Sequence, residues 1–260
     1  MKQLKFWMVA LTLLMGVSFT SCLNSDDAET YDIPGLAVFV KDYMGMVIFE
    51  DMQGNRLIPT TASVTQLETN NQIKLSNYGW AIIYGDYVEK NTNVKATEVD
   101  IVLKSFLGYP LEDVFVVGST GSMEEQMPEN APIISVDNSG FGLFNAKTLM
   151  IPMQWHLGEY KLETFKLHKL KLICVEEEIE ADDTELVLYV RHDRGTDEGK
   201  GYKGGDWYGY NIANALDIFR SKTGKQPIKL VIKTHENAAD TNIPEIYTEH
   251  VVEYKDNTTN

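Results

Sequence analysis

Apolar residues between positions 33 and 105 lie in short runs that alternate with polar ones, as in half-buried β-strands. From Ala96 to Lys104, for example, Val99, Ile101 and Leu103 fall on one face. No helical period longer than two turns occurs in this region. Several short strands in so short a segment favour a small closed or half-closed β-barrel at residues 33–105. Its strands are expected at 36–40, 45–49, 56–60, 80–84 and 96–104.

Longer apolar strands separated by turn residues follow after residue 130, and their hairpin-like spacing predicts an antiparallel β-sandwich at 131–256. One short helix is expected at Tyr210–Arg220, where Ile212, Leu216 and Phe219 form a stripe. Residues 106–130 are turn-rich and polar, and we expect them to connect the two domains. The chain is therefore all-β, with sandwich strands expected at 133–136, 149–155, 161–176, 186–191, 228–235 and 246–254.

The long apolar segment at 161–176 changes its phase midway. Apolar residues occupy odd positions up to Leu167 and even positions from Leu170 onward. One extra residue in a strand produces such a shift, so we expect a β-bulge at His168-Lys169. The alternative is that the strand ends there and the chain turns.

The N-terminal residues have the composition of an export signal. A short basic head precedes an apolar run at 6–19, which is shorter than the ~20 residues that a membrane-spanning helix needs. Such a signal is removed from the mature protein. The residues Phe19-Thr-Ser-Cys22 resemble a lipobox, in which small residues precede a cysteine that receives diacylglycerol. We therefore expect a lipoprotein signal peptide at 1–21 and a lipid anchor at Cys22, an ordinary secretion signal being the alternative.

The residues after Cys22 form an acidic tether at 22–32. Within it, Ser25, Asp26 and Asp27 resemble the acidic export signal of surface lipoproteins in Bacteroidota; a solvated spacer is the alternative. We therefore expect the protein in the cell envelope, anchored in the outer membrane and exposed at the surface. The second cysteine, Cys174, lies in an apolar strand pattern and is expected to be a buried, inert thiol rather than a disulfide partner.

The mature chain is strongly acidic. Removal of residues 1–21 takes away Lys2 and Lys5 and no acidic residue, which changes the net charge from −15 to −17. Nucleic-acid binding needs a basic surface, so we expect no nucleic-acid partner. Aromatic residues make up 10% of the chain, and with abundant β-branched residues they supply enough apolar surface for real cores.

A metal site is a candidate at the ends of two predicted strands. If those strands end at one edge of the sheet, His192 and His235 with Asp193 or Glu236 could bind Zn²⁺ as a metal-dependent hydrolase would. Two histidines at strand ends are more often exposed polar residues. Resident cofactors other than the lipid at Cys22 are therefore not expected, with Zn²⁺ and Ca²⁺ as the alternatives.

The loop expected at 193–206 offers two further patterns. Four acidic residues could surround Ca²⁺, although a solvated acidic loop is the default. The run at 199–204 has G-x-G-x-x-G spacing, but its acidic flanks would repel a pyrophosphate, so we interpret it as a flexible hairpin loop. The four acidic residues are Asp193, Asp197, Glu198 and Asp206.

The sequence contains neither an H-E-x-x-H nor a G-x-S-x-G motif, and we expect no enzymatic activity. The segment "DWYGY" places Trp207, Tyr208 and Tyr210 beside a loop, where they could stack on sugar rings. Trp80 and Trp155 are further candidates for such stacking. Aromatic residues in β-proteins mostly pack in cores, so the glycan platform stays an alternative.

Several segments together resemble the NigD-like family of Bacteroidota lipoproteins. The most characteristic is "LVLYVRHD", followed by a glycine-rich loop and an aromatic-led helix. The resemblance covers most of the mature chain and implies an OB-type barrel followed by a β-sandwich, in a lipoprotein without known enzymatic activity. The other matching segments are "DMQGNRLIPT", "TLMIPMQWHL", "YGYNIANALDIF" and "IKLVIKTHE".

These observations lead to three functional hypotheses. The first is a non-enzymatic surface lipoprotein that binds an envelope protein or peptide, as a bacteriocin immunity factor would. The second is a glycan-binding accessory lipoprotein, based on "DWYGY". The third is a metal-dependent hydrolase at His192 and His235.

Overall fold

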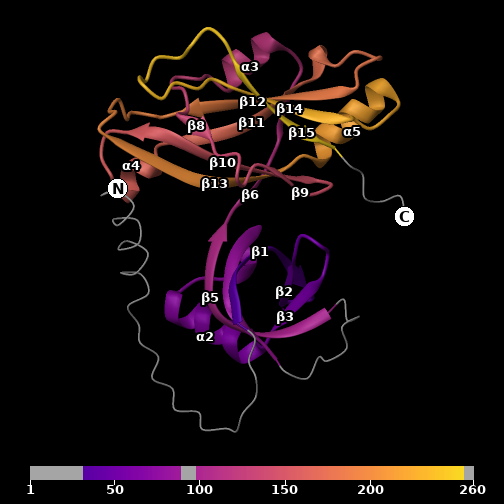
Figure 1. The fold of residues 1–260 in the computed structure, drawn as a ribbon, viewed down its shortest axis with the longest axis vertical. Coiled ribbons are helices and arrows are strands. Elements are labelled where there is room, and N and C mark those ends of the chain that lie inside the picture. Colours follow the sequence, from indigo (N-terminus) through magenta and orange to yellow (C-terminus); the bar gives the residue numbers. More distant parts are fainter. Residues whose placement is uncertain (1–31, 89–97, 255–260) are drawn as a thin grey trace.

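The computed structural model describes residues 32–88 and 98–254 and shows two β-structured parts, a barrel and a sandwich (Figure 1). The N-terminal barrel lies below the sandwich in this view. The signal peptide, Cys22 and the proposed export residues Ser25, Asp26 and Asp27 lie outside the described residues, so those predictions stay predictions. None of the helices that the structure describes is long and apolar enough to cross a membrane.

The described part of the barrel has five strands and is closed, as expected. Its strands pair in the order β1-β2-β3-β5-β4, and β4 pairs again with β1. The β3–β5 ladder is parallel and the others are antiparallel. The strands are β1 (Asp32–Tyr43), β2 (Met46–Glu50), β3 (Arg56–Pro59), β4 (Trp80–Tyr87) and β5 (Glu98–Tyr109). This is the strand arrangement of an OB-like barrel.

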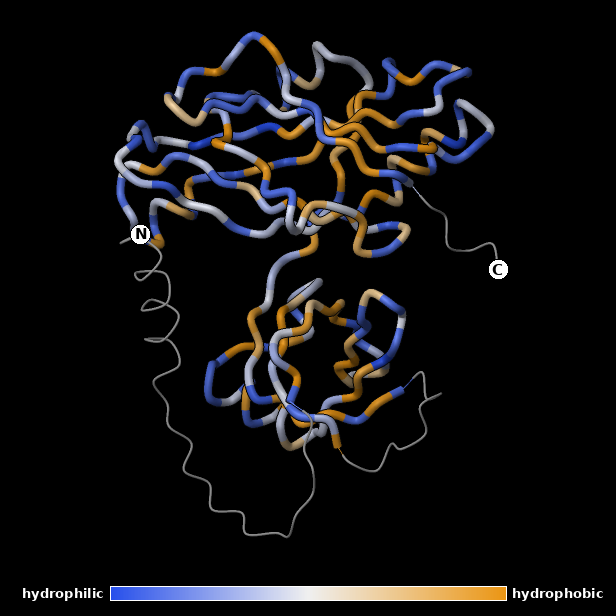
Figure 2. Tube along the Cα trace, in the orientation of Figure 1, coloured by the Kyte–Doolittle hydropathy of each residue, from blue (hydrophilic) through white to orange (hydrophobic). Residues whose placement is uncertain are grey.

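Alternating apolar residues fill the barrel interior, as the period-2 pattern predicts. Figure 2 shows apolar positions interspersed with polar ones along the barrel strands. Close approach of β4 and β5 requires glycine at position 85, where a Cβ atom would lie 2.3 Å from the carbonyl oxygen of Val102. The register of these strands shifts between Tyr84 and Gly85, which lets the sheet curve into a closed barrel. The buried residues are Ile33, Val38, Phe49, Leu57, Leu75, Ala81, Ile83, Ile101 and Leu103.

A helix that the sequence pattern did not predict lies between β3 and β4. This helix, α2 (Thr61–Asn71), is capped by Thr60, whose side chain accepts a hydrogen bond from Ser63 N at 3.4 Å. Only Ser63 is fully buried in it, while Val64 and Leu67 pack against the barrel core. Its apolar stripe is too weak to produce a helical period, so the capping residue was the available signal.

The sandwich consists of two sheets. In the first sheet the strands pair in the order β6-β13-β10-β8, and β9 also pairs with β10. In the second sheet the order is β15-β14-β12-β11-β7. The strands are β6 (Leu111–Asp113), β7 (Phe115–Val117), β8 (Ser135–Val136), β9 (Gly142–Asn145), β10 (Thr148–Leu157), β11 (Lys169–Val175), β12 (Glu185–Asp193), β13 (Tyr202–Asn211), β14 (Lys229–Thr234) and β15 (Thr248–Glu253). The all-β class is confirmed, and most ladders are antiparallel as expected. Three ladders are parallel: β6–β13, β7–β11 and β12–β14.

Short helices pack against the sandwich. They are α3 (Thr120–Gln126), α4 (Leu162–Phe165) and α5 (Ala213–Thr223). The helix expected at 210–220 is α5, shifted three residues later, and it inserts Leu216 and Phe219 into the core between the sheets. Gly224 ends it in the left-handed conformation, with φ 74°. Residues 106–130, expected to be a connector, contain the end of β5 together with β6, β7 and α3.

Two local predictions in the sandwich were wrong. No bulge forms at His168-Lys169: residues 162–165 form α4, the chain turns, and β11 begins at Lys169, which is the alternative interpretation of the phase change. The loop expected to extend to residue 206 ends earlier, because β13 begins at Tyr202. Gly204 and Gly205 lie in a strand because β10 pairs with β13 from Leu157 to Thr148.

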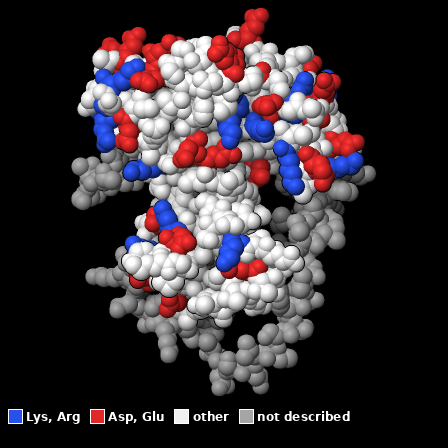
Figure 3. Space-filling model, turned by 180° about the vertical axis from the view of Figure 1, so that it is seen from behind, with Lys and Arg blue, Asp and Glu red and all other residues white. Residues whose placement is uncertain are grey.

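Aromatic residues join the barrel to the sandwich. Trp80 of β4 stacks on Tyr109 with ring centroids 4.2 Å apart and lies 6.3 Å from Trp207 of β13. Phe39 of β1 meets Phe144 of β9 edge-on at 4.4 Å. These contacts form an apolar junction between the two parts. Charged side chains of both signs are spread over both parts on the face seen in Figure 3.

Candidate functional site

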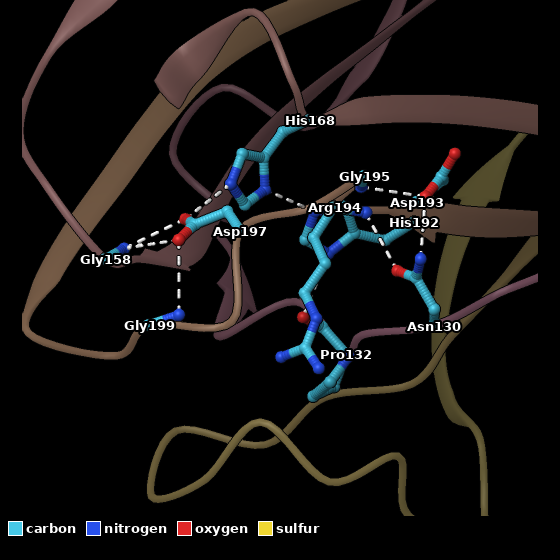
Figure 4. Close-up of polar contacts among 10 residues, drawn as sticks. All are labelled: Asn130, Pro132, Gly158, His168, His192, Asp193, Arg194, Gly195, Asp197 and Gly199. Atoms are coloured by element: carbon cyan, nitrogen blue, oxygen red, sulfur yellow. Dashed lines mark hydrogen bonds and ion pairs between the residues drawn. The ribbon is translucent and has the colours of Figure 1, made fainter. Parts of the chain in front are cut away.

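Two buried histidines and an aspartate form a chain of polar contacts at one end of the sandwich (Figure 4). The chain starts at the carbonyl oxygen of Pro132, which accepts from Nδ1 of His192 at 3.0 Å. Nε2 of His192 lies 2.8 Å from Nδ1 of His168. Nε2 of His168 lies 3.0 Å from Oδ2 of Asp197. We call these four residues the histidine chain.

Strand ends and loops hold the members of the histidine chain in place. His192 is the penultimate residue of β12, and His168 ends the turn between α4 and β11. Asp197 lies in the loop after β12 and accepts hydrogen bonds from the backbone N–H groups of Gly158 and Gly199. The histidine chain therefore connects segments that are far apart in the sequence.

Burial shapes the electrostatics of the histidine chain. Burial lowers the pKa of His192 to about 4, so this ring does not carry a charge of its own at neutral pH. Burial acts against the ionised form of Asp197, but hydrogen bonds from Gly158, His168 and Gly199 outweigh it and hold the pKa of Asp197 below its ordinary value. Asp197 is therefore ionised at neutral pH.

A second polar cluster lies under α3. The Arg191 guanidinium contacts Glu124 at 2.6 Å and Glu129 at 3.4 Å, and it donates to the carbonyl oxygen of Met127. Glu129 also meets Nδ1 of His235 at 2.7 Å. Burial raises the pKa of Glu129, while His235 and Arg191 act in the opposite direction. These groups satisfy one another and fasten α3 to the sheet.

The residues proposed as Zn²⁺ ligands do not come together. His192 belongs to the histidine chain, whereas His235 pairs with Glu129 and stacks on Tyr247 at 3.9 Å. Asp193 accepts from Asn130 and from its own loop at Gly195. Among residues 32–88 and 98–254, no group of three or more His, Cys, Asp or Glu side chains has an arrangement that could hold a metal ion.

The acidic side chains of the loop are not grouped around one point in the described part of the chain either. Asp197 points to Gly158, Asp193 to Asn130, and Asp206 accepts from the backbone N–H of Trp207. The G-x-G-x-x-G run ends inside β13 and precedes no helix, so it lacks the setting of a dinucleotide site. Asp193, Asp197 and Asp206 thus accept hydrogen bonds from separate groups of the protein.

The aromatic residues proposed for glycan stacking have different roles in the structure. Tyr210 is fully buried and donates its hydroxyl proton to the carbonyl oxygen of Leu170, so its ring faces the core. Tyr208 packs against the same core. Trp207 is 38% exposed, but its ring packs over Gly140, where a Cβ atom would lie 2.0 Å away. Its position next to Trp80 makes it part of the junction.

An exposed apolar turn joins β1 to β2. Tyr43, Met44 and Met46 are 58%, 88% and 58% exposed, and we call these residues the hairpin tip. Met44 has φ 53° and the following Gly45 has φ 82°. The carboxylate of Asp42 closes the turn by accepting from Gly45 N at 2.9 Å. A positive φ favours Gly, Asn or Asp at such a turn and strains a methionine.

Several of these residues carry little or no signal in the sequence. His168 lies at the change of phase, which predicts a bulge there. Glu129 and Asn130 carry no motif, and Arg191 lies in "LVLYVRHD" without a signal for its partners. Their contacts span up to 106 residues of sequence, as for Glu129 and His235. No local pattern reports such pairings.

Comparison with known proteins shows the fold. No protein-family model and no curated protein matches the chain. A predicted lipoprotein from Bacteroides fragilis is 24% identical, with a TM-score of 0.68 over 87% of this chain and 100% of that chain. A predicted toxin-related protein from Parabacteroides distasonis is 13% identical, with a TM-score of 0.56 over 86% and 93%.

A NigD-like immunity protein from Bacteroides caccae is 13% identical, with a TM-score of 0.51 over 84% of this chain and 91% of that chain. At these identities the likeness establishes a shared fold. The barrel-and-sandwich architecture expected from the NigD-like resemblance is therefore confirmed.

Proposed function

We propose that this protein is a non-enzymatic lipoprotein of the cell envelope that binds a protein or peptide partner. Its fold, shared with the NigD-like immunity protein and with the predicted Bacteroides fragilis lipoprotein, supports this proposal. The hairpin tip is the observation that carries the partner-binding part. It exposes Tyr43, Met44 and Met46 together at the end of one hairpin. Tyrosine and methionine are enriched in protein interfaces.

The backbone at Met44 strengthens this proposal. A left-handed conformation costs a residue with a Cβ roughly 1–2 kcal/mol, and Asn or Gly would lower that cost. Met44 gains little compensation from packing, since 88% of the residue is exposed. A strained and exposed methionine is explained if a partner buries it.

The choice of a protein or peptide rests on charge and on the polar clusters. The net charge disfavours nucleic acid and anionic surfaces. The buried ionisable groups described above are paired with one another, which supports a binding role over catalysis. An immunity-type role, in which the partner is a peptide toxin, is the specific form that the Bacteroides caccae likeness suggests.

Substitution of Met44 tests partner binding. Met44→Asn relieves the left-handed strain, so we expect a free energy of unfolding that is about 0.5–1 kcal/mol higher. We expect the same variant to lose crosslinks to its envelope partner when a photo-reactive residue replaces Tyr43 in living cells. Met52→Asn is the matched control, because Met52 is 56% exposed in the next turn without a positive φ. Equal crosslinking by wild type and Met44→Asn contradicts the proposal.

Lipid attachment is tested separately. We expect the processed protein to begin at Cys22 and to carry diacylglycerol, which intact-mass measurement of the protein from membranes detects. Cys22→Ser should shift the protein from the membrane to the soluble fraction. A processed chain that begins at another residue contradicts the anchor without affecting the hairpin tip.

A further inference from the structure

The histidine chain has more hydrogen-bond contacts than two neutral rings can supply with protons. Each of its three contacts needs one proton, because a carbonyl oxygen, a carboxylate and an unprotonated ring nitrogen can only accept. Two neutral imidazoles carry one N–H each. We propose that His168 and His192 share one additional proton at neutral pH, which makes the histidine chain a proton-dependent latch at this end of the sandwich.

Removing that third proton makes one contact repulsive. If His168 donates to Asp197, the lone pair on its Nδ1 faces the lone pair on His192 Nε2 at 2.8 Å. If His168 donates to His192 instead, the lone pair on its Nε2 faces the carboxylate at 3.0 Å. Either arrangement would push the partners apart.

The third proton belongs on the rings and not on the carboxyl group. The backbone N–H groups of Gly158 and Gly199 donate to Asp197, and Gly158 reaches both carboxylate oxygens, at 2.9 and 3.1 Å. Donors of this kind favour the ionised carboxylate. The histidine chain therefore consists, in spatial order, of the Pro132 carbonyl, the neutral imidazole of His192, the imidazolium of His168 and the carboxylate of Asp197.

The charged groups around the two rings lie on the end of β12 and the loop that follows it. Asp197 and Asp193 favour a proton on the pair, whereas Arg194 opposes it. Burial is the largest effect on each ring considered alone: it lowers the pKa of His168 and, more strongly, the pKa of His192, so the proton is held by the contacts of the pair as a unit. The proton thus resides mainly on His168, where Asp197 contacts it directly.

Other described segments packed against the pair bring aromatic rings and a carbonyl group. β10 contributes Trp155, whose ring centroid lies 6.0 Å from that of His168 and 6.4 Å from that of His192. The segment before β8 contributes the carbonyl of Pro132, and α4 contributes Phe165, which packs edge-on against Trp155. The charged groups that determine whether the histidine pair holds the extra proton are therefore Asp197, Asp193 and Arg194.

The shared proton makes the stability of the folded state depend on pH. An unfolded histidine loses its proton near pH 6.5, so above this value the folded chain holds one proton more than the unfolded chain. Folding is then weakened as the pH rises, by up to about tenfold in the folding equilibrium constant per pH unit, until the pair loses its proton. At that point the contacts among Pro132, Gly158, His168 and Asp197 loosen together.

Nitrogen-15 NMR of histidine-labelled protein tests the proton directly, with His168→Gln and His192→Gln used for assignment. At pH 7 we expect one ring of the pair to show the imidazolium pattern and the other a single N–H. On raising the pH, both rings should change together and release one proton. Two neutral rings at pH 7, or two separate titrations, overturn the proposal.

Unfolding by urea between pH 6.5 and pH 9 gives an independent test. We expect the folding equilibrium constant of the wild type to fall several-fold more per pH unit than that of Asp197→Asn, which cannot hold the imidazolium. Asp240→Asn is the control, because Asp240 is an acid of the neighbouring surface that pairs with Lys200. Parallel slopes for wild type and Asp197→Asn overturn the proposal. If Asp197→Asn does not fold, the NMR of the wild-type protein decides.

Discussion

Several buried ionisable side chains among the described residues lie in contact with partners of matching chemistry. Arg191 is the clearest case: its side chain is 5% exposed, and Glu129, at 3% exposed, lies beside it. Removing one member of such a pair leaves the other buried without compensation, which costs more than the pair itself contributes. The two polar clusters therefore hold α3 and the adjacent loops on the sandwich.

Arg191→Met should lower the free energy of unfolding by about 3–5 kcal/mol, because Glu129 and the carbonyl of Met127 lose their partner. Urea unfolding followed by circular dichroism measures this change. Arg56→Met is the control: Arg56 pairs with Glu98 while both side chains are more than half exposed, so its loss should cost about 0–1 kcal/mol. Similar costs for the two variants would contradict the role of burial.

Asp197 should also control stability in acid. The lowered pKa of Asp197 means that its ionised form stabilises the folded state above the ordinary aspartate pKa of about 4. As the pH falls below 4 and through the folded-state pKa, that stabilisation is lost. The stability difference between wild type and Asp197→Asn should therefore shrink from pH 5 to pH 2. A difference that stays constant over this range would show that Asp197 acts through its shape alone.

At the scale of elements, helix capping and strand pairing determine the secondary structure of segments whose hydrophobic period is weak. α2 has almost no apolar stripe, and its start is fixed by Thr60. β13 contains three glycines and was expected to begin as a loop, but ten residues of β10 pair with it. Tertiary pairing overrides the low strand propensity of glycine there.

Thr60→Ala should lower the free energy of unfolding by about 1 kcal/mol, since the N–H of Ser63 loses its capping acceptor. Thr65→Ala is the matched control, because Thr65 is an exposed residue inside the same helix and alanine has the higher helix propensity. Thermal unfolding of both variants checks the prediction. Equal stability of Thr60→Ala and wild type would mean that the cap does not hold α2.

At the scale of the whole molecule, the aromatic junction couples the barrel to the sandwich. Trp80, Tyr109 and Trp207 come from both parts, and Gly140 leaves room for the Trp207 ring. The chain passes from β5 to β6 through the single residue Pro110. The hairpin tip is therefore presented by a barrel that is fixed to the sandwich.

Gly140→Ala should weaken this coupling, because its Cβ atom would lie 2.0 Å from the Trp207 ring and displace it. We expect faster proteolytic cleavage near Pro110 and a separation of the barrel and sandwich transitions in calorimetry. Gly121→Ala is the control, since a Cβ there meets only Ser119 Oγ at 3.8 Å. A single cooperative transition with unchanged cleavage in Gly140→Ala would contradict the coupling.

The sequence by itself determined the all-β class, the closed barrel and the position of the sandwich, because alternating apolar residues and turn residues act over short distances. It also indicated α5, whose stripe of Leu216 and Phe219 is local. The tertiary structure alone decided that His168 meets His192 and Asp197, that His235 instead meets Glu129, and that Tyr210 is buried. Those contacts depend on which strands become neighbours, and the energy that selects them comes from burying side chains that are distant in sequence.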